Sequence, residues 1–209
     1  MIISAVIFDL DGTLIDCEKQ WGSAFVEVLK SLEYNSSNKQ PQTGGVSVKK
    51  NWEDLLRRLG INTNKSLDEL ELMTLNNYVK TIPSISLKPG AIDFIKSLKD
   101  DGTRVGLATS TEWWVVEKIF ERLRFEGIFD AVVTGEETSN KKPLPDSFLL
   151  AADKLGLASQ DCLVVGDSQS DVEAAHAAGM KVIVIGDVKN ADINVDGFSE
   201  ITPQVIDRL

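Results

Sequence analysis

The sequence predicts an α/β fold in which a doubly wound parallel sheet carries a helical insertion after its first strand. Two patterns lead to this prediction. Short apolar runs rich in valine and isoleucine alternate with helical periodicities over most of the chain, whereas the stretch from residue 15 to residue 87 shows helical periodicities without a convincing strand. Continuous apolar runs of this length are typical of strands that a parallel sheet buries on both faces.

Five apolar runs are expected to form the strands of the core, at residues 5–8, 105–108, 131–133, 162–165 and 181–185. Amphipathic patterns between them predict four helices, at residues 91–99, 115–123, 148–155 and 172–178. Gly156 and Gly179 follow the last two helices, where C-terminal caps are expected. Strands that alternate with helices in this way predict crossover units and therefore parallel strands.

The insertion is expected to be a small, all-helical cap domain. Its helices are predicted at residues 20–32, 52–59 and 67–80, and residues 81–89 would return the chain to the core. The predicted division assigns residues 1–14 and 88–209 to the core domain, and residues 15–87 to the cap domain.

The composition narrows the possible chemistry. Asp+Glu of 32 against Lys+Arg of 22 gives a net charge of −10, which argues against nucleic acid as the main partner. No apolar run is long enough to cross a membrane, and the apolar start of the chain lacks the basic leader of a secretion signal. Two cysteines without metal-ligand spacing are typical of a reduced protein, so we expect a cytoplasmic location. His176 is the only histidine, which excludes serine–histidine triads and histidine-rich zinc sites.

The strongest functional signal is the pair Asp9 and Asp11, directly after the first predicted strand. Ligands of open α/β sheets bind beyond the carboxyl ends of the strands, so both acids stand where a site is expected. Alternation places the two side chains on the same side, where they repel each other unless a cation compensates their charge. An ordinary Asp-Gly turn would give the same residues. A calcium loop of the EF-hand type is excluded, because Leu14 and Gln20 stand where it needs a glycine and a glutamate.

Three further signals follow predicted strands or lead into helices. Asp167 ends a strand, and Asp171 stands four residues later in the first turn of the next helix. Thr109 and Ser110 end another strand, where hydroxyls and amides can receive phosphate oxygens, and Lys142 precedes a proline turn. Singly, each signal has a structural explanation, as a helix cap or a solvated lysine. Together they gather acids, hydroxyls and a lysine at one crevice.

In this order and context, the motifs resemble those of the haloacid dehalogenase-like hydrolase superfamily, in its phosphoglycolate phosphatase and β-phosphoglucomutase branch. The resemblance covers nearly the whole chain and rests on four motifs: Asp9-x-Asp11-Gly-Thr, Thr109-Ser110, Lys142-Pro143 and Gly166-Asp167 to Asp171. It implies a Rossmann-like core with a helical cap. It also implies a phosphatase that hydrolyses a small phosphorylated metabolite, such as a phosphosugar or phosphoglycolate, as a monomer or homodimer.

The resemblance further implies a role for each motif residue. Asp9 would be the nucleophile that forms an aspartyl-phosphate, and Asp11 would be the general acid and then the general base. Mg²⁺ would be held by the Asp9 carboxylate, the Asp11 backbone carbonyl and Asp167, and the carboxylates of these three residues are expected to converge on the ion. The phosphate oxygens would be held by Thr109, Ser110 and Lys142. Asp171 would act as an indirect ligand of the ion.

Three other activities stay open. A phosphosugar mutase resembling β-phosphoglucomutase would carry an arginine after Gly45-Val46-Ser47 and a Glu-Asp pair in the last motif, but Val48 and Gly166 occupy these positions and favour a phosphatase. A haloacid dehalogenase would lack the second acid, so Asp11 argues against it. A non-catalytic binding protein could keep the same fold, although every chemical position is filled here.

The cap is expected to close over the substrate and to choose the leaving group. Lys49 and Lys50 are its candidate substrate-binding cations, although an exposed helix start explains them equally well. Trp21 and Trp52 are interpreted as core residues rather than as surfaces that bind substrate.

Overall fold

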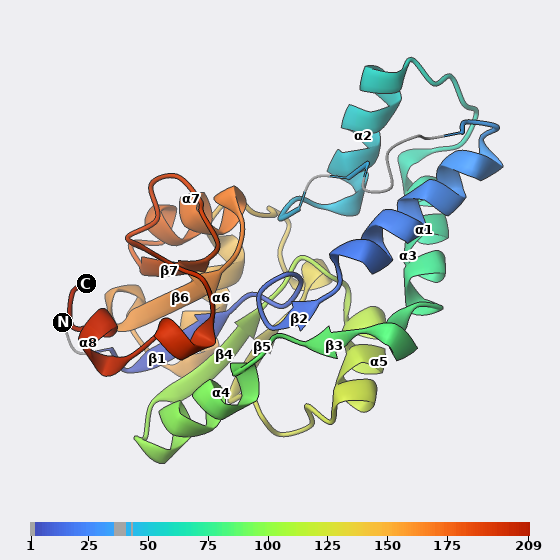
Figure 1. The fold of residues 1–209 in the computed structure, drawn as a ribbon. Coiled ribbons are helices and arrows are strands. Elements are labelled where there is room, and N and C mark those ends of the chain that lie inside the picture. Colours follow the sequence, from blue (N-terminus) through green and yellow to red (C-terminus); the bar gives the residue numbers. More distant parts are fainter. Residues whose placement is uncertain (1–2, 36–40, 43) are drawn as a thin grey trace.

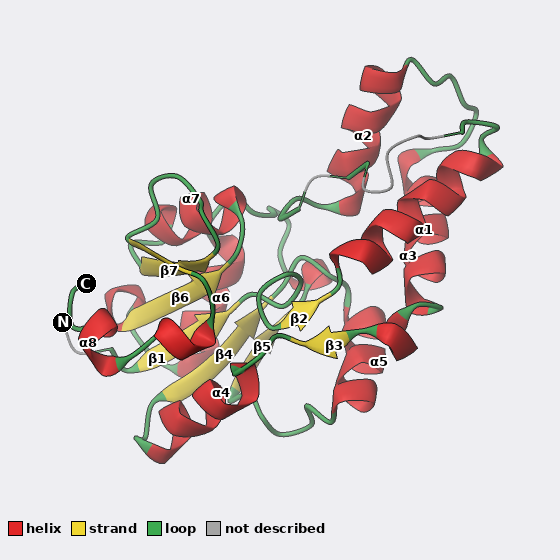
Figure 2. Ribbon diagram, in the orientation of Figure 1, coloured by secondary structure: helices red, strands yellow, loops and turns green. Residues whose placement is uncertain are grey.

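The computed structural model describes residues 3–35, 41–42 and 44–209. Within this part of the chain, six parallel strands form one sheet in the order β5-β4-β1-β6-β7-β8 (Figures 1 and 2). Their bounds are β1 Ala5–Phe8, β4 Arg104–Ala108, β5 Ala131–Val133, β6 Cys162–Gly166, β7 Lys181–Ile185 and β8 Ile193–Val195. The chain builds outward from β1 in both directions, so a topological switch point lies at β1, where ligands of such sheets bind.

Helices cover both faces of the sheet, as the alternation of side chains along β1 shows. Val6 and Phe8 point into one hydrophobic cluster with residues of α4 and α5, whereas Ala5 and Ile7 point into another with residues of α6 and α7. These helices span α4 Ala91–Asp100, α5 Trp113–Leu123, α6 Asp146–Leu155 and α7 Gln169–Ala177. All four β1 side chains are fully buried, and burial of each large one contributes about 1.5–3 kcal/mol. The predicted α/β fold class with a doubly wound parallel sheet is therefore confirmed.

Three helices between β1 and β4 pack against one another at one side of the sheet (upper right in Figure 1). They are α1 Glu18–Ser31, α2 Val48–Leu59 and α3 Leu67–Val79. Their shared cluster includes Phe25 and Trp52, and the Trp52 indole donates to the Thr74 hydroxyl at 2.8 Å. Local chemistry fixes the ends of these helices: Ser47 caps the start of α2, and Ser66 forms a capping box at the start of α3. Trp52 is thus a core residue, as predicted.

Two short strands join the helical unit to the sheet. β2 (Ile15–Asp16) and β3 (Ser86–Leu87) pair antiparallel, so the outgoing and returning chains lie side by side. These two strands were not predicted, because two residues are too few to show periodicity. The pairing lies at the predicted domain boundaries, but the division into core and cap stays a prediction.

Several small elements were not predicted. β8, the short helix α8 (Pro203–Ile206) and the 3₁₀ turns at Ile82–Ser84, Gly135–Glu137, Ser159–Asp161 and Phe198–Glu200 are all too short for a clear sequence pattern. The described helices include none with the length and apolarity needed to cross a membrane.

Candidate active site

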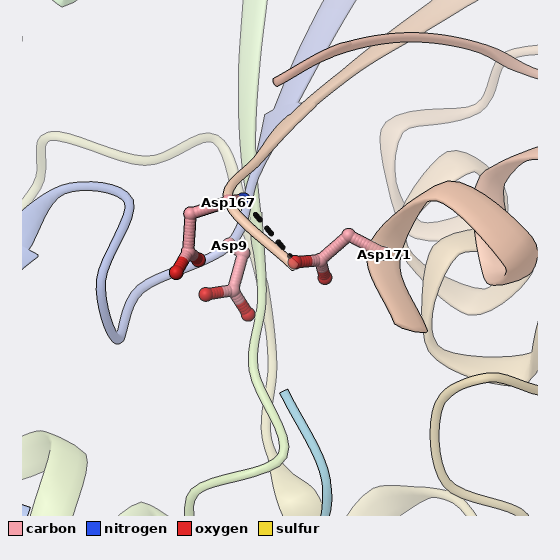
Figure 3. A group of neighbouring side chains, drawn as sticks. All are labelled: Asp9, Asp167 and Asp171. Atoms are coloured by element: carbon pink, nitrogen blue, oxygen red, sulfur yellow. Dashed lines mark hydrogen bonds between the residues drawn. The ribbon is translucent and has the colours of Figure 1, made fainter. Parts of the chain in front are cut away.

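Three aspartates meet at the carboxyl ends of β1 and β6 (Figure 3). Asp9 follows β1 directly, and its amide donates to the Val165 carbonyl at 2.9 Å, so the ladder between β1 and β6 fixes its position. Asp167 follows β6, and Asp171 lies in the first turn of α7. One carboxylate oxygen from each of the three lies within 4.8 Å of the others.

Lys142 reaches this cluster from the loop before α6. Its Nζ donates to Asp9 Oδ1 at 2.6 Å, to Asp171 Oδ1 at 2.8 Å and to the Ala108 carbonyl at 2.9 Å. The side chain is only 2% exposed and lies 4.5 Å from the centre of the Phe148 ring. Burial alone would lower the pKa of Lys142, but the carboxylates of Asp171 and Asp9 raise it, so the ammonium stays charged.

The charges of the cluster do not balance without a further cation. Burial raises the pKa of Asp9 well above its usual range, against the lowering effect of Lys142. Burial and the neighbouring charge of Asp171 raise the pKa of Asp167 to about 7. Three carboxylates and one ammonium leave a formal charge of −2, and buried oxygen ligands with that charge fit a divalent cation. The chemistry of the donor set therefore fits a metal ion.

Asp171 is already fully engaged. Its Oδ2 accepts hydrogen bonds from the Ser168 hydroxyl at 2.6 Å and from the Ser168 amide at 3.1 Å, and its Oδ1 accepts from Lys142. These bonds cap α7 and hold the loop after β6. Asp167 has a different partner, the Thr13 hydroxyl at 2.8 Å. Asp171 therefore positions Lys142 and the loop, and its prediction as an indirect ligand of the ion stays open.

Gly12 has a steric function in the site. It has φ of +92°, and a Cβ there would lie 2.2 Å from the Asp167 carboxylate. Only glycine lets the loop after Asp11 pass this close to Asp167.

The Asp11 carboxylate is not among the three that lie within 4.8 Å of one another, which corrects one expectation. Its Oδ1 accepts from the Trp21 indole at 2.9 Å and the Tyr78 hydroxyl at 3.1 Å, and its Oδ2 accepts from the Thr111 hydroxyl at 2.8 Å. Asp9 and Asp167 thus meet Asp171 rather than Asp11, whose carboxylate is held by these donors. A role for the Asp11 backbone carbonyl as a metal ligand stays a prediction.

The residues that hold Asp11 were missed from the sequence. Trp21 and Tyr78 come from α1 and α3 and stack with ring centroids 3.8 Å apart. Cys17 adds a longer contact from its thiol to Asp11 at 3.4 Å, and burial followed by the Asp11 charge raises the pKa of both Cys17 and Tyr78. Trp21 was interpreted as a core residue, but it also lines the cavity and binds Asp11. An indole near an Asp-x-Asp motif gives no sequence signal of such a contact.

Thr109 and Ser110 follow β4 and face the same cavity. Thr109 is 2% exposed, and its Oγ1 accepts from the Thr111 amide at 3.0 Å. Gly135 lets a second segment approach closely, because a Cβ there would lie 2.3 Å from the Ser110 carbonyl. The structure thus brings both residues to the cavity that Asp9 and Lys142 line, and their binding of phosphate stays a prediction.

The cavity has a volume of about 630 Å³ and lies between the sheet edge and the three helices of the insertion. Lys49 lines it, whereas Lys50 is not among the lining residues and pairs with Glu53. A contact also joins the insertion to the loop after β6 beside the cavity: the Ser170 hydroxyl donates to the Gly45 carbonyl at 2.5 Å. Gly45 has φ of +73°, and a Cβ there would lie 2.2 Å from the Ser168 hydroxyl.

The fold and site are those of a phosphate-ester hydrolase in which carboxylates stand at the ends of parallel strands. A family model described as haloacid dehalogenase-like hydrolase matches residues 6–185, and the chain belongs to this family. Hexitol phosphatase B of Escherichia coli K12 is 29% identical over 96% of this chain and 95% of its own length. Phosphoglycolate phosphatase of Aquifex aeolicus is 32% identical over 84% of this chain and 81% of its own.

Solved structures agree with this assignment. CbbY from Rhodobacter sphaeroides in complex with phosphate is 27% identical and superimposes with a TM-score of 0.82, covering 95% of this chain and 96% of CbbY. β-Phosphoglucomutase from Clostridium difficile, at 22% identity, shares the fold with a TM-score of 0.86 over 99% of this chain and 96% of its own. The predicted family and the assignment to its phosphatase-type enzymes are confirmed, and the mutase remains represented among the relatives.

Proposed function

We propose that this protein is a Mg²⁺-dependent phosphatase that hydrolyses a small phosphate monoester through a phosphorylated Asp9. The contact between Asp9 and Lys142 at 2.6 Å carries the proposal. A nucleophile at Asp9 would be buried at a strand end beside the Lys142 ammonium, which can neutralise the equatorial oxygens of a transferring phosphoryl group. Asp167, within reach of Asp9, would hold the metal ion together with Asp9 and the Asp11 carbonyl.

The reaction would take two displacements at phosphorus. In the first, an Asp9 oxygen attacks the phosphorus atom, and the ester oxygen leaves with a proton donated by Asp11. In the second, water attacks the aspartyl-phosphate while Asp11 accepts its proton, which releases inorganic phosphate and restores Asp9. A bound Mg²⁺ would reduce the repulsion between Asp9 and the anionic phosphate. Thr109 and Ser110 would bind the oxygens of the phosphate group.

The helical unit at residues 15–87 would act as the cap. It supplies part of the cavity wall and the residues that hold Asp11, which supports the proposed division from residues 1–14 and 88–209. Both cysteines are buried free thiols, in keeping with a reducing compartment such as the cytoplasm. The substrate would be a small phosphorylated metabolite, as the names of the relatives suggest for those proteins.

Two observations favour phosphatase activity over phosphosugar mutase activity. A Cβ at Gly166 would lie 2.6 Å from the Asp171 Cβ. The glutamate expected at this position in a mutase therefore does not fit the loop in its present conformation. Val48, which starts α2, takes the place of the arginine expected after Ser47 in a mutase.

Replacement of the nucleophile tests the proposal. Asp9→Asn removes the attacking carboxylate and keeps the shape of the side chain, so we expect phosphate release from p-nitrophenyl phosphate with Mg²⁺ to fall to background. Circular dichroism should show an unchanged fold. The wild-type protein with EDTA should also be inactive and should recover when Mg²⁺ is added. Substantial turnover by pure Asp9→Asn protein would contradict the assigned nucleophile.

A further inference from the structure

The loop after β6 is held together by hydrogen bonds to one carboxylate oxygen. Asp171 Oδ2 accepts from the Ser168 hydroxyl at 2.6 Å and from the Ser168 amide at 3.1 Å. The Asp167 amide donates to the same oxygen at 3.3 Å (dashed line in Figure 3). Ser168 and Asp171 are buried, so water does not compete for these bonds. Residues 167–171 are therefore fixed relative to one another as one unit.

The insertion contacts this unit through the backbone of Gly45. The Ser170 hydroxyl is buried and donates to the Gly45 carbonyl at 2.5 Å. Gly45 also lies against both serines of the loop, because a Cβ on it would lie 2.2 Å from the Ser168 hydroxyl and 2.5 Å from the Ser170 hydroxyl. The close contact depends on the glycine, whose φ of +73° also disfavours a side chain. The loop thus contacts the insertion through serines, whereas its aspartates contribute to the proposed metal site.

The shared backbone of the loop joins these two contacts. Ser168 gives its one hydroxyl hydrogen to Asp171, and Ser170 gives its own to Gly45. The 3.4 Å between the two serine oxygens is therefore a packing contact, and the hydrogen bonds do not form a continuous relay. Ser170 lies in the chain between Asp167 and Asp171, so fixing any one of the three limits the positions open to the other two.

Charge makes the loop sensitive to a cation. Besides burial, the charges of Asp171 and Asp167 raise the pKa of Asp9, because these carboxylates repel one another. Lys142 compensates only one of the three negative charges. A divalent cation held by Asp9 and Asp167 would remove the remaining repulsion and favour the arrangement of the loop that contacts the insertion.

We infer that Ser170 is a positioning residue that couples the seating of the insertion, defined by its contact with Gly45, to cation binding at the loop after β6. This inference rests on the proposed function, which requires the cation. Coupling between two equilibria is reciprocal, so the cation strengthens the contact by the same factor by which the contact strengthens cation binding. The insertion is then seated more firmly when the site holds its ion.

The affinity for Mg²⁺ tests the coupling from the side of the core. Ser170→Ala removes the hydroxyl without adding atoms. We expect the dissociation constant for Mg²⁺, measured by isothermal titration calorimetry, to rise about fivefold, as loss of one hydrogen bond between neutral groups does. Ser97→Ala is the matched control, because the Ser97 hydroxyl also donates to a backbone carbonyl but lies on α4. An equal rise in both variants would contradict the inference.

The affinity of a variant in the insertion separates coupling from a local effect. Gly45→Ala changes no residue of the loop, and the atoms nearest to its Cβ belong to Ser168 and Ser170. We expect Mg²⁺ affinity to fall about as much as in Ser170→Ala. Gly44→Ala, whose Cβ has no atom within 4 Å, should leave it unchanged. Weaker binding in Ser170→Ala but not in Gly45→Ala would show a local effect of the serine and would overturn the inference.

Hydrogen exchange measures the coupling in the reverse direction. Mg²⁺ should slow amide exchange of the wild-type protein at residues 44–47 about fivefold, and Ser170→Ala should lose this slowing. Equal exchange with and without Mg²⁺, in a protein that binds the ion and hydrolyses p-nitrophenyl phosphate, would overturn the inference and leave the proposed function intact. A wild-type protein that neither binds Mg²⁺ nor releases phosphate would contradict both.

Discussion

The hydrogen bonds to Asp11 predict how proton transfer responds to the loss of one donor. Tyr78 is fully buried and donates to Asp11 Oδ1 at 3.1 Å, beside the Trp21 indole at 2.9 Å. Tyr78→Phe removes this one hydroxyl and keeps the ring that stacks on Trp21. We expect the variant to fold, and to hold Asp11 less firmly in the position from which it exchanges protons with the leaving group.

The size of the effect follows from the bonds that remain. A hydrogen bond to a charged group contributes about 1.5–3 kcal/mol, and each 1.36 kcal/mol changes a rate about tenfold. In the variant, Asp11 keeps the Trp21 indole on Oδ1 and the Thr111 hydroxyl on Oδ2, so the lower end of the range applies. We therefore expect kcat for an alkyl phosphate to fall about tenfold, with KM little changed.

The choice of leaving group separates this role from a purely structural one. An alkoxide needs a proton as it leaves, whereas p-nitrophenolate hardly does, so kcat for p-nitrophenyl phosphate should fall much less than kcat for glycerol 3-phosphate. The control is Tyr34→Phe, at the other tyrosine of the chain. Tyr34 packs against the hydrophobic cluster of Phe25 and Trp52, so this substitution should leave both rates unchanged. Equal losses for both substrates, or a faster alkyl reaction in Tyr78→Phe, would refute the assigned role of Tyr78.

Two other predictions concern cap closure and the metal site. Gly45→Ala introduces a Cβ 2.2 Å from the Ser168 hydroxyl at a φ of +73°, so we expect kcat/KM to fall about tenfold. Gly44→Ala is the control, because no atom lies within 4 Å of its Cβ, and it should leave kcat/KM unchanged. Equal effects of the two substitutions would contradict a role of Gly45 in closing the cavity. Folding raises the pKa of Asp167 from its ordinary value of 3.8 to about 7 in the absence of metal. Between these two values, the folded state therefore binds more protons than the unfolded state. The melting temperature in EDTA should therefore fall as pH rises from about 4 to about 7, and Mg²⁺ should reduce this dependence; a flat profile in EDTA would contradict the raised pKa.

The fold could be predicted from the sequence wherever an element is buried on both sides. β1, β6 and β7 are continuous apolar runs because helices cover both faces of the sheet, and such runs are legible in a single sequence. β8 was missed because it is short and, as the last strand of the sheet, has one neighbour only, so its apolar pattern is weak. The β2 and β3 pairing has no local signal at all.

The site divides in the same way. Asp9, Asp167 and Lys142 could be predicted because each stands next to a strand end or a proline turn, where position along the chain implies position in the fold. The orientation of Asp11 could not, because its partners Trp21 and Tyr78 lie 10 and 67 residues away and are brought together by helix packing in the insertion. Side-chain direction after a strand depends on such distant donors, and alternation alone misplaced this carboxylate.

This difference in support has a consequence for how the enzyme works. The proposed nucleophile Asp9 and its partner Lys142 are held directly by the sheet and its loops. Asp11 is held from both sides, by Thr111 of the core and by Tyr78 of the insertion. With the proposed roles, protonation of the leaving group by Asp11 would depend more directly on the seating of the insertion than attack at phosphorus by Asp9 would. Changes that loosen the insertion should therefore slow substrates with poor leaving groups first, because these substrates depend most on a proton from Asp11.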